Sequence, residues 1–365
     1  HLWVGRFEAD AIRPYALGHF RDLLLATSRS PAMLFYLDNQ LNTAPGSAGA
    51  KGNQTGINEN YAREIMELHT LGVDGGYTQN DVIALAHILT GWGLARPGLG
   101  RGDGSAQVFD ASRHDFSPQT FLGRTIASGG EEAGVVAVDL LARSPATARH
   151  IAFQLAQYFV ADTPPKGLVD QLAQRFQQTG GDIAAVLKTL LTSREFRDSA
   201  GQKYKTPYQY VISAARSTGV EVNNPRPLIG TMARLGEPLY YCQTPDGYKN
   251  TEEAWLSPDA TTLRIGFATG LGRGNLPLKN PPPEQSPAPA MTQAAPNMAQ
   301  APQAQLVADK HDAKPDQPKP EPLDVAPLQT LLAPVLSDNT RAAVAEAPDN
   351  LKAALVLGSP DFMRR

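Results

Sequence analysis

The 365-residue sequence contains a single cysteine, Cys242, and no excess of charge of either sign. One cysteine can form neither an internal disulfide framework nor a cluster of thiolate metal ligands. The 33 Lys and Arg residues stand against 36 Asp and Glu, so we expect no basic nucleic-acid-binding surface. No apolar run reaches the roughly 20 residues that a membrane-spanning helix needs. We therefore expect no nucleic-acid partner and no membrane span within these residues.

Several catalytic signatures are also missing. The sequence has no Gly-x-Ser-x-Gly elbow, no phosphate loop, no dinucleotide fingerprint after a predicted strand and no His-Glu-x-x-His zinc motif. The glycine-rich stretch at residues 72–76 lacks the lysine of a phosphate loop, and we interpret it as a turn between helices. The chain begins at His1, and we expect any targeting signal to lie upstream of it, which leaves the localisation unknown.

The sequence does contain residues that are typical of helix starts. Thr78 and Asp81 form a capping box before an apolar segment with helical spacing. Ser144 followed by Pro145 combines an N-cap with proline at the first helical position. The alternation typical of strands is confined to a short piece around Leu239–Gln243. We predict an all-α fold, a multi-helix orthogonal bundle with at most a small β-hairpin.

Composition changes sharply near residue 280. Residues 280–327 are dominated by Pro, Ala, Gln, Lys and Asp, and bury too little apolar surface to offset the entropy lost on ordering. We therefore predict a helical domain over residues 1–279 and a long, disordered Pro/Ala-rich insertion over residues 280–327. Helices at residues 328–365 are expected to pack back on the main domain.

A short internal repeat supports a folded segment after this insertion. The sequence Leu-Thr-Ser-Arg-Glu-Phe at residues 191–196 matches Leu-Gly-Ser-Pro-Asp-Phe at residues 357–362. Each copy follows an amphipathic segment that we expect to open as a helix at an aspartate, Asp182 or Asp349. We interpret both copies as the same helix-plus-cap unit.

The most distinctive stretch is residues 58–71, which we predict to be one continuous α-helix. At about 100° per residue, Glu64 and Glu67 lie on one side and His69 lies in the middle of the opposite, apolar arc. Ligands on one helix converge only when they are three or four residues apart, so His69 is not expected to join the glutamates around a metal ion. We interpret His69 as a buried histidine hydrogen-bonded to a backbone carbonyl.

Two interpretations of the Glu64–Glu67 pair remain open. With Asn60 and Arg63 beside it, the pair could perform acid–base chemistry or hold a divalent metal ion, provided that another segment closes over it. Alternatively, Arg63 bridges Glu59 and Glu67 through two i,i+4 ion pairs on a solvated helix face. We favour this ladder, and the metal ion is the cofactor that the first interpretation would need.

Other titratable residues offer weaker signals. His114 and Asp115 are adjacent in a predicted loop, where they could ligate a metal ion or act as a base, although solvated loop histidines are common. His150 is expected to face solvent early in a helix. Lys203 and Lys205 are interpreted as surface cations with packed stems.

Aromatic residues supply the candidate ligand contacts. Tyr77 and Trp92 flank the helix that follows the Glu64 segment, and together with Asn60 they are candidate ligand-binding residues. Tyr248 belongs to an aromatic-rich stretch around a Pro-Asp-Gly turn. This stretch could line a ligand groove or anchor a long loop, and we favour anchoring.

Several motifs follow one another in a recognisable order. Around the candidate helix they are Asn58-Glu-Asn-Tyr-Ala-Arg-Glu64, Glu67-Leu-His-Thr-Leu-Gly72, Gly75-Gly-Tyr-Thr-Gln79 and Leu89-Thr-Gly-Trp92. Elsewhere they lie at residues 13–18, 31–34, 36–39, 114–115, 145–148, 205–207, 245–248 and 359–362. Together they resemble the bacterial domain-of-unknown-function 1800 family over nearly the whole chain outside the insertion.

The resemblance implies an uncharacterised, exported bacterial protein, periplasmic or secreted, of a family often encoded beside a second uncharacterised exported family. It supplies no catalytic residues. We therefore expect a partner-binding or accessory scaffold whose partner is another exported bacterial protein. The alternative is a metal-dependent, hydrolase-type enzyme that uses Glu64, Glu67, Arg63, His114 and Asp115. The enzyme interpretation requires His114 and Asp115 to fold against the two glutamates.

Overall fold

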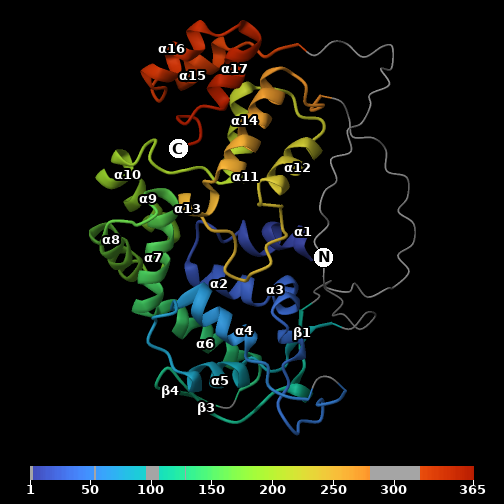
Figure 1. The fold of residues 1–365 in the computed structure, drawn as a ribbon. Coiled ribbons are helices and arrows are strands. Elements are labelled where there is room, and N and C mark those ends of the chain that lie inside the picture. Colours follow the sequence, from blue (N-terminus) through green and yellow to red (C-terminus); the bar gives the residue numbers. More distant parts are fainter. Residues whose placement is uncertain (1–2, 53–54, 96–106, 128, 280–320) are drawn as a thin grey trace, which may run out of the picture. The chain divides into compact units, whose positions relative to one another are not determined.

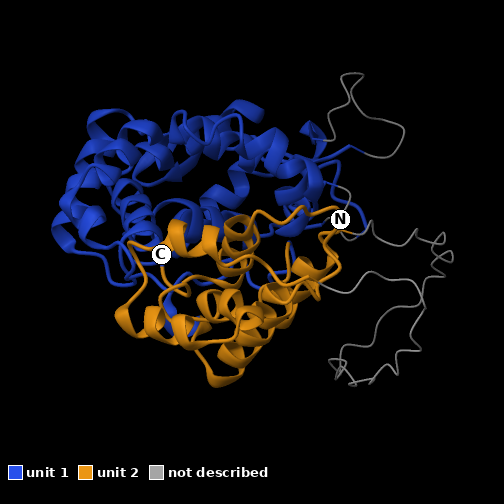
Figure 2. Cartoon of the chain, turned by 90° about the horizontal axis from the view of Figure 1, so that it is seen from above, with its two compact units in different colours: residues 1–204, 240–254, 365 blue, residues 205–239, 255–364 orange. Residues whose placement is uncertain are grey.

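The computed structural model describes residues 3–52, 55–95, 107–127, 129–279 and 321–365. These residues form two compact units (Figure 2). Unit 1 comprises the described residues up to Tyr204, together with Tyr240–Ala254 and Arg365, and unit 2 comprises those of Lys205–Leu239 and Trp255–Arg364. The boundaries of the two units are drawn from tertiary contacts. The boundaries predicted after residues 279 and 327 are drawn from the change in composition. Residues 280–320, most of the predicted insertion, lie outside the described residues.

Unit 1 consists of helices with two small strand pairs. Its elements are α1 (Val4–Arg6), η1 (Phe7–Ile12), α2 (Phe20–Ser28), α3 (Pro31–Tyr36), η2 (Asn39–Leu41), α4 (Asn60–Glu64), η3 (Ile65–Thr70), α5 (Gln79–Ile88), β1 (Trp92–Leu94), β2 (Gln107–Phe109), η4 (Ala111–Arg113), β3 (Gln119–Phe121), β4 (Arg124–Ile126), α6 (Glu131–Arg143), α7 (Pro145–Phe159), α8 (Lys166–Gln178), α9 (Ile183–Leu191) and α10 (Arg194–Asp198). Of the short turns, η1 and η3 are π-helical, and η2 and η4 are 3-10 helices.

The secondary-structure elements of unit 2 in its described residues are all helices. Its elements are α11 (Pro207–Thr218), α12 (Arg226–Arg234), α14 (Pro258–Gly272), α15 (Ala326–Leu332), α16 (Asp338–Glu346) and α17 (Asp349–Leu357), and the short α13 (Glu252–Trp255) contains a unit boundary. The C-terminal helices pack within this unit, with α17 on α14 and α15 on α11 (Figure 1). The all-α fold class predicted from the sequence is confirmed.

The β-structure amounts to two antiparallel pairs. Strand β1 pairs with β2, and β3 pairs with β4 through a tight turn at Leu122 and Gly123, whose φ angles are 49° and 71°. The predicted strand piece at Leu239–Gln243 is wrong, because Tyr240 has a φ of 57°. A non-glycine residue in this left-handed region ends an extended strand and makes a turn.

The predicted continuous α-helix over residues 58–71 is also wrong. It is α-helical only to Glu64 and continues as the π-helical turn η3. The Leu71 amide donates to the Met66 carbonyl five residues back (2.8 Å), and the Thr70 hydroxyl donates to the Ile65 carbonyl (2.7 Å). The wider turn rotates the side chains that follow Glu64 away from their α-helical directions.

Small residues allow the helices of unit 1 to approach closely. Ala148, Ala152 and Ala156 form a fully buried stripe along α7 at a spacing of four residues. Helix α8 packs beside α7, and its Leu168 and Leu172 are fully buried, with α9 next to both helices (Figure 1). A stripe of methyl groups leaves room for these larger side chains and fixes the neighbouring helices with few voids.

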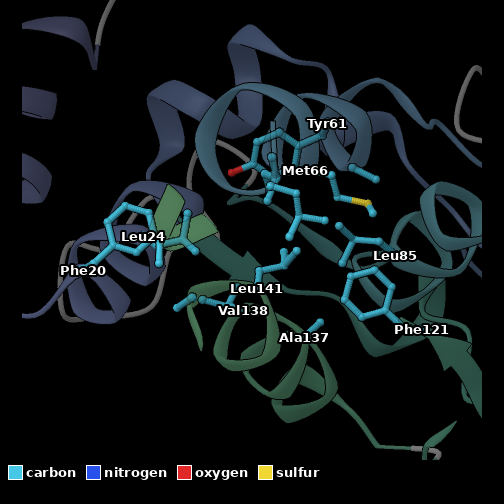
Figure 3. Packing of buried hydrophobic residues seen from close by; sticks show 14 of the residues in the cluster. Phe20, Leu24, Tyr61, Met66, Leu85, Phe121, Ala137, Val138 and Leu141 are labelled. Atoms are coloured by element: carbon cyan, nitrogen blue, oxygen red, sulfur yellow. The ribbon is translucent and has the colours of Figure 1, made fainter. Parts of the chain in front are cut away.

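The rest of the unit 1 core gathers around α4, α5 and α6. Figure 3 shows Tyr61, Met66, Leu85 and Leu141 in one apolar cluster. The Tyr61 hydroxyl is satisfied inside the core, because it donates to the Ser28 carbonyl at 2.6 Å. The core thus fixes one side of the α4–η3 segment, the segment that carries the predicted glutamates.

Candidate functional site

Unit 1 contains a cavity of about 820 Å³. Phe7, Phe20 and Leu24 line it from the N-terminal helices, and Phe153 and Tyr158 line it from α7. Most of the lining is apolar, with a few polar groups that include two histidines. This combination of size and lining is typical of ligand-binding sites in proteins.

The two histidines of the cavity are His69 and His150. His150 lies 3.2 Å through its Nε2 from the Leu68 carbonyl, whereas His69 makes no hydrogen bond among the described residues. The prediction of a carbonyl-bonded His69 is therefore wrong, and so is that of a solvent-facing His150. Burial lowers the pKa of both imidazoles, and the neighbouring His150 charge lowers that of His69 further. The cavity therefore presents neutral imidazole groups at neutral pH.

One wall of the cavity is the segment Pro245–Thr251, which we call the strap. Asp162 holds its end through both carboxylate oxygens: Oδ1 accepts from Lys203 Nζ at 2.5 Å and Oδ2 from the Glu252 amide at 2.6 Å. Lys203 also donates to the Asn250 carbonyl at 2.6 Å. Lys203 is only 3% exposed, so its interpretation as a surface cation is wrong. A partner distant in sequence, Asp162, explains the burial of its charge.

A second hollow of about 450 Å³ adjoins the cavity. His150 and Phe153 line both spaces, so the two hollows share these side chains in their walls. Val73, 69% exposed, and Arg149 lie at the second hollow. We call the two spaces together the unit 1 groove.

The Glu64–Glu67 pair belongs to the same α4–η3 segment. Burial raises the pKa of Glu64, and so do the negative charges of Glu67 and of Asp246 on the strap. The Tyr77 hydroxyl lies 3.5 Å from Glu67, which brings a predicted ligand-binding residue to this pair. The two carboxylates therefore interact, as the predicted helix face required.

The predicted ion-pair ladder is present only in part. Arg63 pairs with Glu59 at 3.1 Å and also donates to Gln79, which in turn donates to Glu59. A pair between Arg63 and Glu67 is not among the ion pairs of the described residues. The Arg63–Glu67 pair is missing because Glu67 lies in the π-helical turn η3. In this turn, residues four apart no longer have the relative positions of an α-helix.

His114 and Asp115 contact residues other than the two glutamates. His114 is buried, and its ring nitrogens lie 2.7 Å from the carbonyls of Thr90 and Gly129. Asp115 pairs with His87 at 2.5 Å and accepts from the Ser117 amide and hydroxyl. None of these contacts reaches Glu64 or Glu67.

The remaining predicted ligand-binding residues, Asn60, Trp92 and Tyr248, lie in three different places. Trp92 is fully buried in the core, with the Arg29 guanidinium 5.2 Å from its ring centre. Asn60 donates through its side chain to the Leu37 carbonyl at 3.3 Å. Tyr248 lies in the strap and lines the cavity. Of the three, only Tyr248 lines the unit 1 groove.

Sequence reasoning missed Phe153 and Lys249, and it included Asp246 only as part of the Pro-Asp-Gly turn. Asp246 and Lys249 flank Tyr248 in the strap and form an ion pair, and Lys249 lowers the pKa of Asp246 through a hydrogen bond. The Pro245-Asp-Gly turn motif was the available signal for this wall. Phe153 looked like any other apolar residue of an amphipathic helix.

Two further features of the described residues bear on metal ions and membranes. Within the described ranges, no group of three or more His, Cys, Asp or Glu side chains is arranged to hold a metal ion. Among the helices of the described chain, none combines the length and the apolarity that crossing a bilayer requires.

The fold and the groove define an all-α protein with a pocket suited to an apolar ligand. The sequence profile of the family described as "Protein of unknown function (DUF1800)" matches residues 1–364. The chain therefore belongs to this family, as its motifs predict. No curated protein and no solved structure gives a significant match to the chain.

Proposed function

We propose that this chain is a non-enzymatic, exported accessory protein that binds a segment of a partner protein in the unit 1 groove. The observation that carries the proposal is the pair of adjoining hollows, about 820 and 450 Å³, that share His150 and Phe153. Two adjoining hollows with shared walls fit a chain segment with two apolar side chains better than they fit one compact molecule.

The chemistry of the groove favours binding over reaction. Its charged strap residues Asp246 and Lys249 pair with each other, and His150 contacts a backbone carbonyl. The exposed apolar side chains Phe153 and Val73 instead offer surface that a partner would remove from water. The family resemblance supports an exported protein, and the partner class that follows is a second exported bacterial protein.

The test is photo-cross-linking in the producing bacterium. A benzophenone amino acid replaces Phe153 in one variant and, as a control, Leu191 in another; Leu191 is a comparably exposed apolar residue on α9 outside the groove. We expect one dominant protein adduct at position 153 and none at position 191. Equal adducts at both positions would contradict a specific groove.

The identified partner segment then allows an affinity measurement. Phe153→Ser removes a central apolar contact, so we expect the Kd of the purified segment to rise at least about tenfold, within the range of a hot-spot residue. Leu191→Ser should leave the Kd unchanged. A Phe153→Ser variant that binds as tightly as the parent protein would refute the groove as the binding site.

A second candidate function is metal-dependent hydrolysis at the Glu64–Glu67 pair alone, without the predicted His114 and Asp115, which contact other residues. It is favoured by one observation: burial and mutual repulsion raise the pKa of Glu64, and a cation would relieve that repulsion. In this alternative the two carboxylates hold a divalent ion, and Tyr77 is positioned by its contact with Glu67.

Calorimetric titration with Mg²⁺, Mn²⁺, Ca²⁺ and Zn²⁺ tests the alternative. Binding of one of these ions that disappears in Glu64→Gln would support it, provided that Glu132→Gln, a control on α6, retains the binding. Absence of binding, or equal binding in both variants, would defeat the assignment.

A further inference from the structure

Unit 2 has a cavity of its own, of about 580 Å³, between α14, α16 and α17. Its apolar part is formed by Ile265, Val344, Leu351 and Leu355, of which Ile265 and Leu355 are 49% and 40% exposed. Small residues on the same helices, such as Ala343, leave the space open. The proposed partner binding does not involve this cavity.

The polar end of the cavity is built around Asp361. Its Oδ2 accepts three hydrogen bonds: from the Ser337 amide (2.9 Å), the Ser337 hydroxyl (2.8 Å) and the Thr340 hydroxyl (2.6 Å). Its Oδ1 accepts none from the described residues. Burial raises the pKa of Asp361, but the hydrogen bonds from Thr340 and Ser337 outweigh that effect and lower it, so the group is ionised at neutral pH.

Asp361 belongs to the internal repeat that the sequence shows. In both copies the serine hydroxyl accepts from the phenylalanine amide three residues on, Ser193 from Phe196 and Ser359 from Phe362, each at 3.1 Å. Both serines donate to the carbonyl three residues back, each at 2.7 Å. The repeat is therefore a structural one, and its acidic position is Glu195 in the first copy and Asp361 in the second.

The charges around the cavity favour a cationic occupant. Asp361 is the one charged residue among the described residues that line it. Arg341 acts on Asp361 through its charge, but it pairs with Asp338 at 2.9 Å. The positive N-terminal end of α16 offsets part of the carboxylate charge, yet Asp361 already fills the position at which an anion would bind there.

We propose that unit 2 binds an amphipathic cation, an alkyl or aryl amine whose apolar body enters this cavity and whose ammonium group meets the free Asp361 Oδ1. A charge-assisted hydrogen bond at one end and apolar contact along the body recognise the two halves of such a ligand. The site is separate from the unit 1 groove and needs no partner protein.

Calorimetry with three probes of equal chain length tests this site in the full chain at pH 7: octylammonium, octanol and octanoate. We expect octylammonium to bind at least about tenfold more tightly than octanoate, with octanol between them. Equal affinity for all three probes, preference for octanoate, or no binding of octylammonium would overturn the proposal.

Two kinds of variant test the charge of Asp361 and the space in the cavity separately. Asp361→Asn should abolish the preference for octylammonium, and its counterpart in the repeat, Glu195→Gln, should preserve it. Because Asp361 also accepts hydrogen bonds from Ser337, the N-cap of α16, its replacement could unfold the unit, so Ala343→Trp provides an independent test. The exposed Ala343 lines the cavity, and a tryptophan there should weaken all three probes while circular dichroism stays unchanged. Undiminished octylammonium binding by Ala343→Trp would refute the site.

Discussion

Replacing Lys203 by methionine tests how the strap over the unit 1 cavity is held. The substitution keeps the length of the side chain and removes the two charge-assisted hydrogen bonds to Asp162 and to the Asn250 carbonyl. Removing one partner of a fully buried ion pair costs about 3–5 kcal/mol. Since the Asp162 side chain is 34% exposed and water can reach it, we expect about 2–3 kcal/mol.

The assay combines thermal unfolding with hydrogen exchange. For a unit of this size, about 2–4 °C is lost per kcal/mol, so the transition of unit 1 should fall by roughly 4–12 °C. Amide exchange should accelerate first in residues 245–251. Lys188→Met is the control, because Lys188 is exposed on α9 and its side chain makes no hydrogen bond or ion pair with the described residues. If Lys203→Met shifted the transition no more than Lys188→Met, or left exchange in residues 245–251 unchanged, the anchoring role would be refuted.

Three further substitutions have expected outcomes. Gly134→Ala would place a Cβ atom 2.3 Å from the buried Trp92 ring, so the ring or α6 must shift, and denaturant titration should show a loss of about 1–3 kcal/mol. An unchanged midpoint would contradict this packing. Glu64 has a raised pKa, so the stability of the folded state falls as pH rises above 4.5, the ordinary pKa of a glutamate. Glu64→Gln should therefore be more stable than the parent protein at pH 7 but not at pH 4. The reverse order would contradict the shift. His69 has a lowered pKa, so the stability of the folded state is lost as pH falls below about 6.5. His69→Leu should reduce the loss of stability between pH 7 and pH 5. An unaltered dependence of stability on pH would show that His69 does not contribute.

Local signals in the sequence predicted the helix starts well. The capping box of Thr78 and Asp81 is present, and the Ser144 hydroxyl accepts at the start of α7, where Pro145 is the first residue. Asp182 likewise caps α9. These signals succeed because an N-cap satisfies backbone groups within three residues, so the sequence contains both partners. Asp349 differs, since it lies inside α17 after Pro348, which makes no side-chain cap.

Features that depend on distant contacts could not be predicted. The π-helical turn at Ile65–Thr70 replaces an α-helix whose propensity and spacing are unremarkable in the sequence. Lys205 was interpreted as a surface cation, yet it is buried, with Nζ 3.8 Å from the centre of the Phe362 ring and bonded to the Phe362 carbonyl. Its partner is more than 150 residues away, and no local pattern encodes that pairing.

The difference between local and distant contacts also explains which part of the candidate site could be predicted. The Glu64–Glu67 pair could be located because its members are only three residues apart, which keeps them close although Glu64 ends α4 and Glu67 lies in η3. The groove could not, because it brings together Phe20, Phe153 and the strap, which are far apart in sequence. Periodicity identifies the apolar face of a helix but does not show whether a neighbouring helix fills the space beside it.

Hydrogen–deuterium exchange of the full chain, with and without the partner segment recovered by cross-linking at position 153, tests partner binding in the unit 1 groove most directly. The groove account predicts slowed exchange in residues 68–75, 149–158 and 245–251. Protection confined to unit 2, or to residues 59–64 and 77–82 around the carboxylates, with no change in those three segments, would contradict it.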